Sequence, residues 1–303
     1  MIYTVTLNPA IDYVISVDAP INISGINRNT AEEFQFGGKG VNVSMMLQTL
    51  GHRSVALGFV AGFTGDDLVT GLQQAGLQTD FVRLDHGTTR INVKIKADTE
   101  MEINGIGPEI LAQDIEALYS RIDKITDGDV LVLSGSVPKS LPEDTYEKML
   151  ARYQGRGIMS VVDSTGAYLI NTLKYNPFLI KPNIHELEEI FGAKAQDDAE
   201  IIEWAKKLQE MGGRNILVSM AGEGALLLDE NANIHRVRCP KATVINSVGA
   251  GDSMVAGFIA GYLETRNYLQ ALRLGVLCGS ATAFSKGMAS KEQIFKLQKQ
   301  GEI

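Results

Sequence analysis

The sequence is poor in cysteine and contains no long apolar run. Its two cysteines, Cys239 and Cys278, are far apart and match no spacing of metal ligands, which argues against a zinc site or a disulfide framework and favours buried free thiols. No apolar segment is long enough to span a bilayer, and the N-terminal segment has no basic leader before an apolar core. These absences predict a cytoplasmic protein without a membrane partner.

The chain also lacks a concentration of positive charge. It has 28 Lys and Arg against 36 Asp and Glu, a formal charge of −8, and no basic block that could follow a nucleic-acid backbone. Of its 303 residues, 45% are hydrophobic and 21% are charged, which suits a folded core. We therefore expect no nucleic-acid partner, and any anion that the protein binds must meet a local positive site.

Short apolar runs alternate with helical patterns along the chain. Seven runs are apolar on both faces, as in strands covered by helices on each side, and they cover residues 3–7, 55–60, 130–133, 158–162, 178–180, 216–218 and 226–228. Between the first two, Val43, Met46, Leu47 and Leu50 repeat with the period of an amphipathic helix. The pattern predicts a layered α/β fold with a mainly parallel central sheet.

One strand pattern differs from the others. In residues 91–97 apolar and polar side chains alternate strictly, as in a strand with one face on protein and the other on water or a ligand. Residues 12–36 lack a helical pattern and could pair with it, so we predict a small β-sheet lid from segments at about 12–36 and 88–105. No linker or repeat separates these segments from the rest, and residues 1–303 are interpreted as one domain.

A glycine-rich segment at residues 246–253 leads directly into a helical pattern. Its glycines allow a tight turn that aims the N–H groups of Gly249, Ala250 and Gly251, with the positive end of the helix dipole, at an anion. Asp252 follows in the first turn, where it could take a proton from an attacking hydroxyl during phosphoryl transfer. The alternative is that the glycines only start the helix and Asp252 only caps it.

A second glycine cluster precedes the helical pattern of residues 43–50. Gly37, Gly38 and Gly40 let a ligand approach the backbone closely, while Lys39 supplies a cation and Asn42 a two-sided amide. The segment is not a Walker loop, which requires serine or threonine where Gly40 stands. Its alternative interpretation is an ordinary glycine turn.

Together the two clusters resemble the signature regions of the PfkB (ribokinase-like) family of carbohydrate kinases. The Gly-Gly-Lys-Gly-x-Asn stretch at 37–42 and the Gly-Ala-Gly-Asp stretch at 249–252 match in order and separation. The resemblance covers essentially the whole chain, with further matching segments at 6–12, 89–94, 134–138, 181–186 and 219–224. It implies a ribokinase-like three-layer α/β/α fold, ATP and Mg²⁺ as cofactors, and homodimers that form through the lid.

Within this family the chain is most similar to the 1-phosphofructokinases. The resemblance makes Asp252 the base, assisted by the amides of residues 249–251. It assigns to the substrate Asp12, Gly37, Gly38, Lys39, Gly40, Asn42, Arg90, Asn92 and Ser136. It assigns to the nucleotide Lys181, Asn183, Glu186, Ser219, Gly222, Gly224, Gly251 and Gly279, with Glu186 holding magnesium through water.

Three of these residues also have physical interpretations of their own. Arg90, at the start of the alternating strand, could offer a planar guanidinium fork to a phosphate already on the sugar, or it could be a solvated surface arginine. Glu186 could be a first-turn carboxylate that complements a helix dipole. Gly279 could serve only the packing of helices.

The resemblance indicates that the γ-phosphate of ATP is transferred to fructose 1-phosphate, which gives fructose 1,6-bisphosphate. Tagatose 6-phosphate and fructose 6-phosphate stay open as substrates, because residues 104–109 are also similar to the tagatose branch. A catalytically silent sugar-phosphate sensor is the alternative from a different class. Loss of the base would be its signature, and Asp252 is present.

Overall fold

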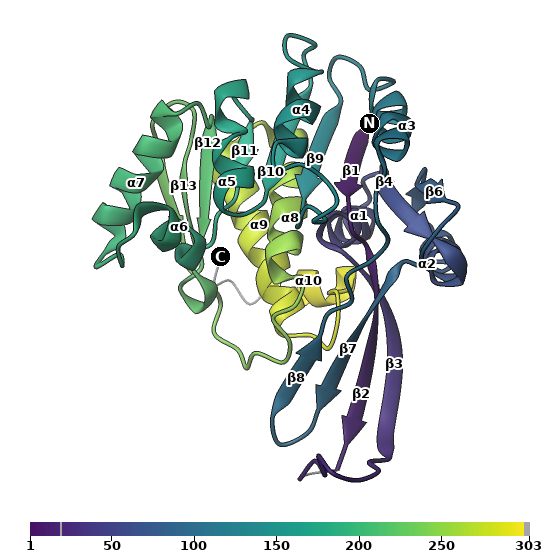
Figure 1. Cartoon of the computed structure of the whole chain (residues 1–303). Helices are drawn as coiled ribbons and strands as arrows, with labels where there is room; N and C mark the ends of the chain where they lie inside the picture. Colours follow the sequence, from purple (N-terminus) through teal and green to yellow (C-terminus); the bar gives the residue numbers. More distant parts are fainter. Residues whose placement is uncertain (19, 300–303) are drawn as a thin grey trace.

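The centre of the molecule is a ten-stranded β-sheet (Figure 1). The computed structural model describes residues 1–18 and 20–299. The strands are β1 (Ile2–Thr6), β4 (Ser54–Ala61), β5 (Gln78–Thr79), β6 (Val82–Leu84), β9 (Val130–Ser134), β10 (Met159–Asp163), β11 (Leu179–Ile180), β12 (Asn215–Ser219), β13 (Ala225–Leu228) and β14 (Ile234–Val237). They lie in the order β14-β13-β12-β11-β10-β9-β1-β4-β5, with β6 beside β4. In this sheet β13 runs antiparallel to both of its neighbours, β12 and β14, and the other neighbouring strands pair in parallel.

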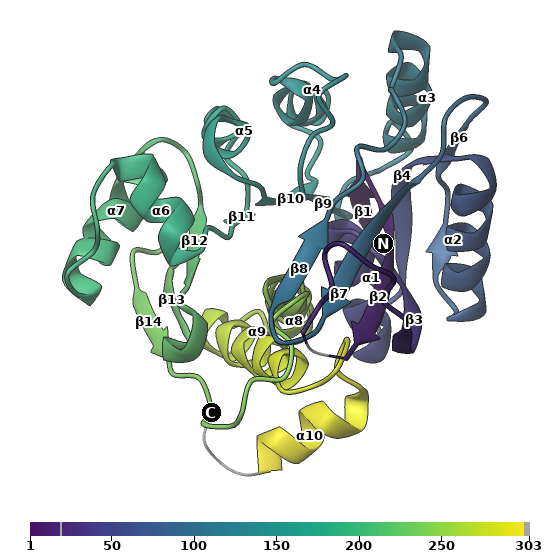
Figure 2. The same cartoon turned by 60° about the horizontal axis from the view of Figure 1, so that its bottom comes forward.

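Helices cover both faces of this sheet. They are α1 (Lys39–Thr49), α2 (Gly62–Gln74), α3 (Ala112–Ile122), α4 (Thr145–Ala151), α5 (Gly166–Ile170), α6 (Ile184–Phe191), α7 (Asp198–Glu210), α8 (Ala250–Thr265), α9 (Tyr268–Ala283) and α10 (Lys291–Lys299), with 3-10 turns at Leu173–Tyr175 and Ala221–Glu223. Figure 2 shows α3 to α7 above the sheet and α8 to α10 below it. Leu118 and Trp204 belong to the core of one face, whereas Met46 and Phe258 belong to that of the other. The predicted three-layer α/β/α architecture is confirmed.

The carboxyl ends of the parallel strands meet at one edge of the sheet, which is where open α/β sheets bind ligands. β1, β9 and β10 are neighbours there and end at Thr6, Ser134 and Asp163. The two helices that follow the glycine clusters, α1 and α8, pack against each other. The sequence therefore brings its two glycine clusters to this edge.

Four further strands form a separate sheet that projects from the body (Figure 1). They are β2 (Ala10–Val17), β3 (Asn29–Gly37), β7 (Arg90–Lys96) and β8 (Glu100–Ile103), in the order β3-β2-β7-β8. β2 and β7 pair in parallel. The prediction that residues 91–97 lie outside the main sheet and pair with the segment at 12–36 is confirmed.

The two faces of this small sheet differ in polarity. On one face Asp12 of β2 lies beside Asn92 of β7, which is only 7% exposed. On the other face Tyr13 of β2 stacks on Phe34 of β3, and Ile91 of β7 is 39% exposed. On β7 the buried side chain is therefore the polar Asn92, which bonds to Asp12 of β2 at the inner face, whereas Lys96 at the end of the strand is exposed.

The two cysteines are free. Cys278 is buried, as predicted, but Cys239 is only half-buried, because it lies in the irregular segment after β14 and meets Ser280 at 3.1 Å. Within residues 1–18 and 20–299, the helices are too short or too polar to cross a membrane.

Candidate active site

The first turn of α8 holds the candidate base. Gly249 precedes the helix with φ 78°, a left-handed conformation that glycine adopts without strain. This turn places Asp252 as the third residue of α8, where it is only 6% exposed. The Ala250 N–H donates to the Ser247 carbonyl at 3.2 Å, so the N–H groups of its neighbours are better placed to face an anion.

The two glycine clusters meet at Asp252. α1 begins after Gly38, whose φ is 123°, and Asn42 lies in its first turn. Asn42 Nδ2 donates a hydrogen bond of 2.7 Å to Asp252 Oδ2, although 210 residues separate the two. A side chain at Gly40 would lie 2.6 Å from Thr6 Oγ1, so glycine is required for α1 to begin this close to β1.

Asp252 is a stronger base than an exposed aspartate. Burial, together with the negative charge of Asp163, raises the pKa of Asp252 to about 6. The hydrogen bond from Asn42 and the charges of Lys39 and Lys181 act in the opposite direction and limit this rise. A carboxylate with such a pKa is ionised near neutral pH and is still able to accept a proton.

Asp163 is a member of this group that no sequence motif identified. It ends β10 and is 1% exposed, with its Oδ1 atom 3.3 Å from Lys181 Nζ and 3.5 Å from Lys39 Nζ. Burial would raise the pKa of Asp163, but the two lysines outweigh it and lower that pKa. The available signal was a charged residue directly after the apolar run at 158–162, at the ligand-binding edge of a parallel sheet.

A cleft of about 260 Å³ lies beside these residues and contains two of the predicted cations. Its lining residues are Thr6, Asn8, Gly38, Lys39, Arg90, Ser134, Gly135, Ser136, Ser164 and Thr165. Arg90 is half-buried, and its Nε atom donates to the Asn8 carbonyl at 3.1 Å. The structure thus brings Gly38, Lys39, Arg90 and Ser136 together in one cleft, and their contact with the substrate stays a prediction.

Asp12 and Asn92 lie on the inner face of the small sheet. Asn92 Nδ2 donates to Asp12 Oδ1 at 2.8 Å, and Lys94 Nζ lies 2.7 Å from Asp12 Oδ2. Gly37 is beside this carboxylate, since a side chain there would approach Asp12 Oδ2 to 3.5 Å. The sequence alone places Lys94 only in the alternating strand, because it does not reveal the register that pairs this residue with Asp12.

The residues predicted to bind the nucleotide lie around the ends of β11 and β12. Asn183 and Glu186 form a reciprocal capping box at the start of α6, with both hydrogen bonds at 2.9 Å. Ser219 ends β12 and forms a bridge with Asn183. The Nζ atom of Lys181 would lie 3.3 Å from a side chain at Gly251, so this ammonium group lies against the first turn of α8.

The three remaining glycines differ in their surroundings. Gly222 has open space around it, which suits the approach of a ligand. At Gly224 a side chain would lie 2.1 Å from the Val237 carbonyl oxygen, and at Gly279 it would lie 3.0 Å from that of Ala250. Close packing is therefore a sufficient reason for the last two glycines, and their contact with a nucleotide stays a prediction.

A magnesium ion would find one suitable carboxylate at this end of the site. Glu186 is half-exposed. Burial acts to lower the pKa of Lys39, but the negative charge of Asp163 and, to a smaller extent, that of Glu186 outweigh burial and raise this pKa. Within the described part of the chain, no three His, Cys, Asp or Glu side chains are grouped to hold a metal. These residues fit an ion that takes its other ligands from nucleotide phosphates and water, as Mg²⁺ commonly does.

Comparisons with known proteins show which family the whole chain resembles. A model of the "pfkB family carbohydrate kinase" matches residues 5–294. The chain is similar to a 1-phosphofructokinase of Bacillus subtilis strain 168, with 45% identity over 98% of this chain and 97% of that protein. It is also similar to a D-tagatose-1-phosphate kinase of Bacillus licheniformis, with 36% identity over 100% of this chain and 99% of that protein.

A solved structure shares the fold over nearly the full length. It is phosphofructokinase-2 from Escherichia coli in complex with substrates and products, with a TM-score of 0.93, 28% identity, and coverage of 99% of this chain and 98% of that chain. The three-layer body with its small separate sheet is therefore the predicted ribokinase-like fold.

Proposed function

The chain belongs to the pfkB family of carbohydrate kinases, and on this premise we propose that it transfers the γ-phosphate of ATP to fructose 1-phosphate. The acceptor is the free primary hydroxyl of the sugar, and the product is fructose 1,6-bisphosphate. The observation that carries the proposal is the buried Asp252 carboxylate in the first turn of α8, beside a cleft that holds Lys39 and Arg90. A kinase that draws on ATP in this way would act in the cytoplasm.

In the proposed reaction Asp252 accepts the proton of the attacking hydroxyl, which then forms the new bond to the γ-phosphorus as the bond to ADP breaks. Asn42 orients the carboxylate through its hydrogen bond of 2.7 Å. The amides of Gly249 and Gly251, the positive end of the α8 dipole and the ammonium of Lys181 stabilise negative charge on the transferring group.

The cleft beside β1 and β9 suits the phosphate that the sugar already carries. Arg90 offers a planar fork, and Lys39 and Ser136 supply a charge and a hydroxyl within the same cleft. Asp12 and Asn92 on the inner face of the small sheet would bind the sugar hydroxyls. Gly37, Gly38 and Gly40 would bind the sugar through their backbone at the start of α1, which Gly40 also allows to lie close to β1.

ATP would lie at the opposite side of Asp252, near Lys181, Asn183, Ser219 and Gly222, with Gly224 and Gly279 at its border. Bound Mg²⁺ would neutralise the nucleotide phosphates, and Glu186 would hold it through water. The small sheet would act as a lid whose closure keeps water from competing as phosphoryl acceptor. Residues 1–303 would work as one kinase domain with this lid.

Substrate choice is the test of the function. We expect the specificity constant kcat/KM for fructose 1-phosphate to exceed those for fructose 6-phosphate and tagatose 6-phosphate by at least about tenfold, measured side by side with ATP and Mg²⁺. Greater activity on one of the 6-phosphates would show that this sugar, and not fructose 1-phosphate, is the substrate. Binding of ketose phosphates without turnover of any would instead support a sugar-phosphate sensor.

A homodimer through the lid is also supported. The outer face of the small sheet carries the apolar side chains of Tyr13, Ile15, Phe34, Ile91, Val93, Ile95, Met101 and Ile103, as the strand registers require. Phe34 is 61% exposed, which is unusual for a phenylalanine in a strand. A second copy presents the same apolar face, so two lids can cover each other across a two-fold axis.

A further inference from the structure

A buried carboxylate beside the base has no role in the reaction described above. Asp163 is as inaccessible as the core strands around it, yet it carries charge. Its Oδ1 atom pairs with both Lys181 and Lys39, at 3.3 and 3.5 Å, and its buried Oδ2 atom has no hydrogen-bond partner among the described residues. Burying a charge is costly, so its retention requires a reason.

The charges around Asp252 suggest that reason. A phosphoryl-transfer site needs cations near the transferring group, but cations also weaken a carboxylate as a base. The groups that act on Asp252 are Asn42 and Lys39 from α1, Lys181 after β11 and Asp163 from β10. Of these, only Asp163 strengthens the base.

We propose that Asp163 is a positioning residue that holds Lys39 and Lys181 beside the first turn of α8 and preserves Asp252 as a proton acceptor. One carboxylate thereby reconciles two opposed requirements, because it keeps both ammonium groups near the phosphoryl path while its own charge offsets their effect on the base. The proposal rests on the proposed function, in which Asp252 is that base.

The direct test is the titration of Asp252 in the full-length protein without substrate. The carboxyl carbons of aspartate are labelled for NMR, and the Asp252 signal is identified by its loss in Asp252→Asn. In Asp163→Asn the pKa of Asp252 falls from about 6 towards the 3.8 of an unperturbed aspartate, because a like charge is removed and two cations are left unbalanced. In Lys181→Met the pKa rises, because an opposing cation is removed.

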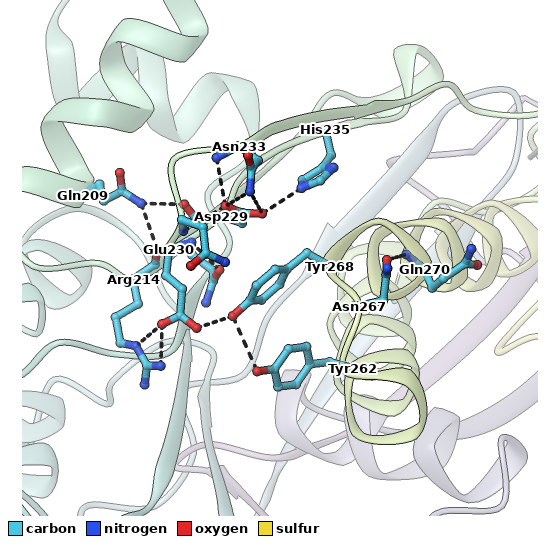
Figure 3. A network of polar contacts seen from close by, with 12 residues as sticks. Gln209, Arg214, Asp229, Glu230, Asn233, His235, Tyr262, Asn267, Tyr268 and Gln270 are labelled. Carbon is cyan, nitrogen blue, oxygen red and sulfur yellow. Dashed lines mark hydrogen bonds and ion pairs between the residues drawn. The ribbon is translucent and has the colours of Figure 1, made fainter.

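Asp229 supplies a matched control. Like Asp163 it is 1% exposed, but it directly follows β13. The last residue of β13, Leu228, pairs with Ile216 near the start of β12, so Asp229 lies at the opposite end of the parallel strands from the active site. There it accepts hydrogen bonds from Asn233 and meets His235 at 2.8 Å (Figure 3). Asp229→Asn therefore leaves the pKa of Asp252 unchanged.

The outcomes separate this proposal from the function on which it rests. Opposite shifts in Asp163→Asn and Lys181→Met support it, and a folded Asp163→Asn with an unchanged Asp252 pKa overturns it. If Asp163→Asn does not fold, Lys181→Met and Lys39→Met decide, because both must raise that pKa. Since the titration needs no substrate, it can succeed even where the kinase assay fails. In an active enzyme, Asp163→Asn also moves the acid limb of the kcat/KM profile to lower pH.

Discussion

At the scale of single residues, Asp252 carries the clearest prediction. Asp252→Asn should keep the fold and the affinity for ATP but lower kcat by at least ~10²-fold, the lower range for loss of a positioned proton acceptor. In the wild type, kcat/KM for fructose 1-phosphate should fall as the pH drops below about 6, because protonated Asp252 cannot accept the hydroxyl proton. Steady-state kinetics at several pH values measure both effects, and near-native turnover in the variant would remove Asp252 from its role.

The same residue should lower stability at neutral pH. Its folded-state pKa of about 6 lies above the 3.8 of the unfolded chain, so its contribution is fully present below pH 4 and is lost as the pH rises through 6. Asp252→Asn lacks this loss and should be more stable than the wild type at pH 8, by up to about 3 kcal/mol. Urea unfolding at pH 8 and pH 5 should show a larger difference at pH 8. A difference that grows towards acid pH would contradict the raised pKa.

Arg90 tests which ligand occupies the cleft. Arg90→Ala should raise KM for fructose 1-phosphate at least ~30-fold, since truncating one partner of a buried charge pair costs ~2 kcal/mol or more. Arg90→Lys should restore only part of this loss, because an ammonium group lacks the planar fork. KM for ATP should change little. Arg83→Ala, at an exposed arginine of β6 paired with Asp66, is the control, and an effect of Arg90→Ala confined to ATP would place this residue on the other ligand.

At the scale of elements, the start of α1 depends on a close approach between helix and strand. In Gly40→Ala the new methyl group would lie 2.6 Å from Thr6 Oγ1 and 2.8 Å from the Val5 carbonyl oxygen, so α1 must move away from β1. We expect the free energy of unfolding to fall by roughly 1–3 kcal/mol, with a loss of kcat, because Asn42 moves with the helix. Gly287→Ala, where no atom lies within 4 Å, should change the free energy of unfolding by less than about 0.5 kcal/mol. Equal stability of the two variants would show that α1 tolerates the shift.

The same elements show what the sequence can predict. Strands such as β9 and β10 are apolar on both faces, so their existence and their helical cover were readable from composition and period alone. The short strands β5, β6 and β14 were not predicted, because each includes polar residues, whereas the equally short β11 and β13 are entirely apolar. The polarity of the lid faces also had to come from the structure, since alternation in 91–97 does not reveal which side is buried.

The active site, too, could be predicted from the sequence only in part. Its glycine-led helix starts were visible as motifs, because only glycine accepts the φ of 123° at Gly38 and 78° at Gly249 without strain. The hydrogen bond between Asn42 and Asp252 joins residues that are 210 positions apart, so it depends on the packing of α1 on α8. Asp163 belongs to no motif, and its pairing with two lysines is visible only in the structure.

At the scale of the whole molecule, the proposed lid would connect assembly with catalysis. Its inner face carries Asp12 and Asn92, while its outer face exposes Phe34 and its apolar neighbours. A four-stranded sheet that projects from the body has few contacts to hold it in place. A partner that covers its outer face would therefore also order the substrate residues on its inner face.

Phe34→Glu tests this connection, because it places two charges in the proposed two-fold contact, one from each copy. The side chain is exposed in the single chain, so the fold should survive. Sedimentation should show a monomer for the variant and a dimer for the wild type. KM for fructose 1-phosphate should rise at least ~5-fold as the lid loses its support, and the specific activity of the wild type should fall on dilution below the dissociation constant of the dimer. Phe295→Glu, at a phenylalanine of α10 that is 48% exposed outside the lid, should leave mass and KM unchanged. If the mass of the Phe34→Glu protein is unchanged, the interface lies elsewhere. A fully active monomer would show that the lid is ordered without a partner.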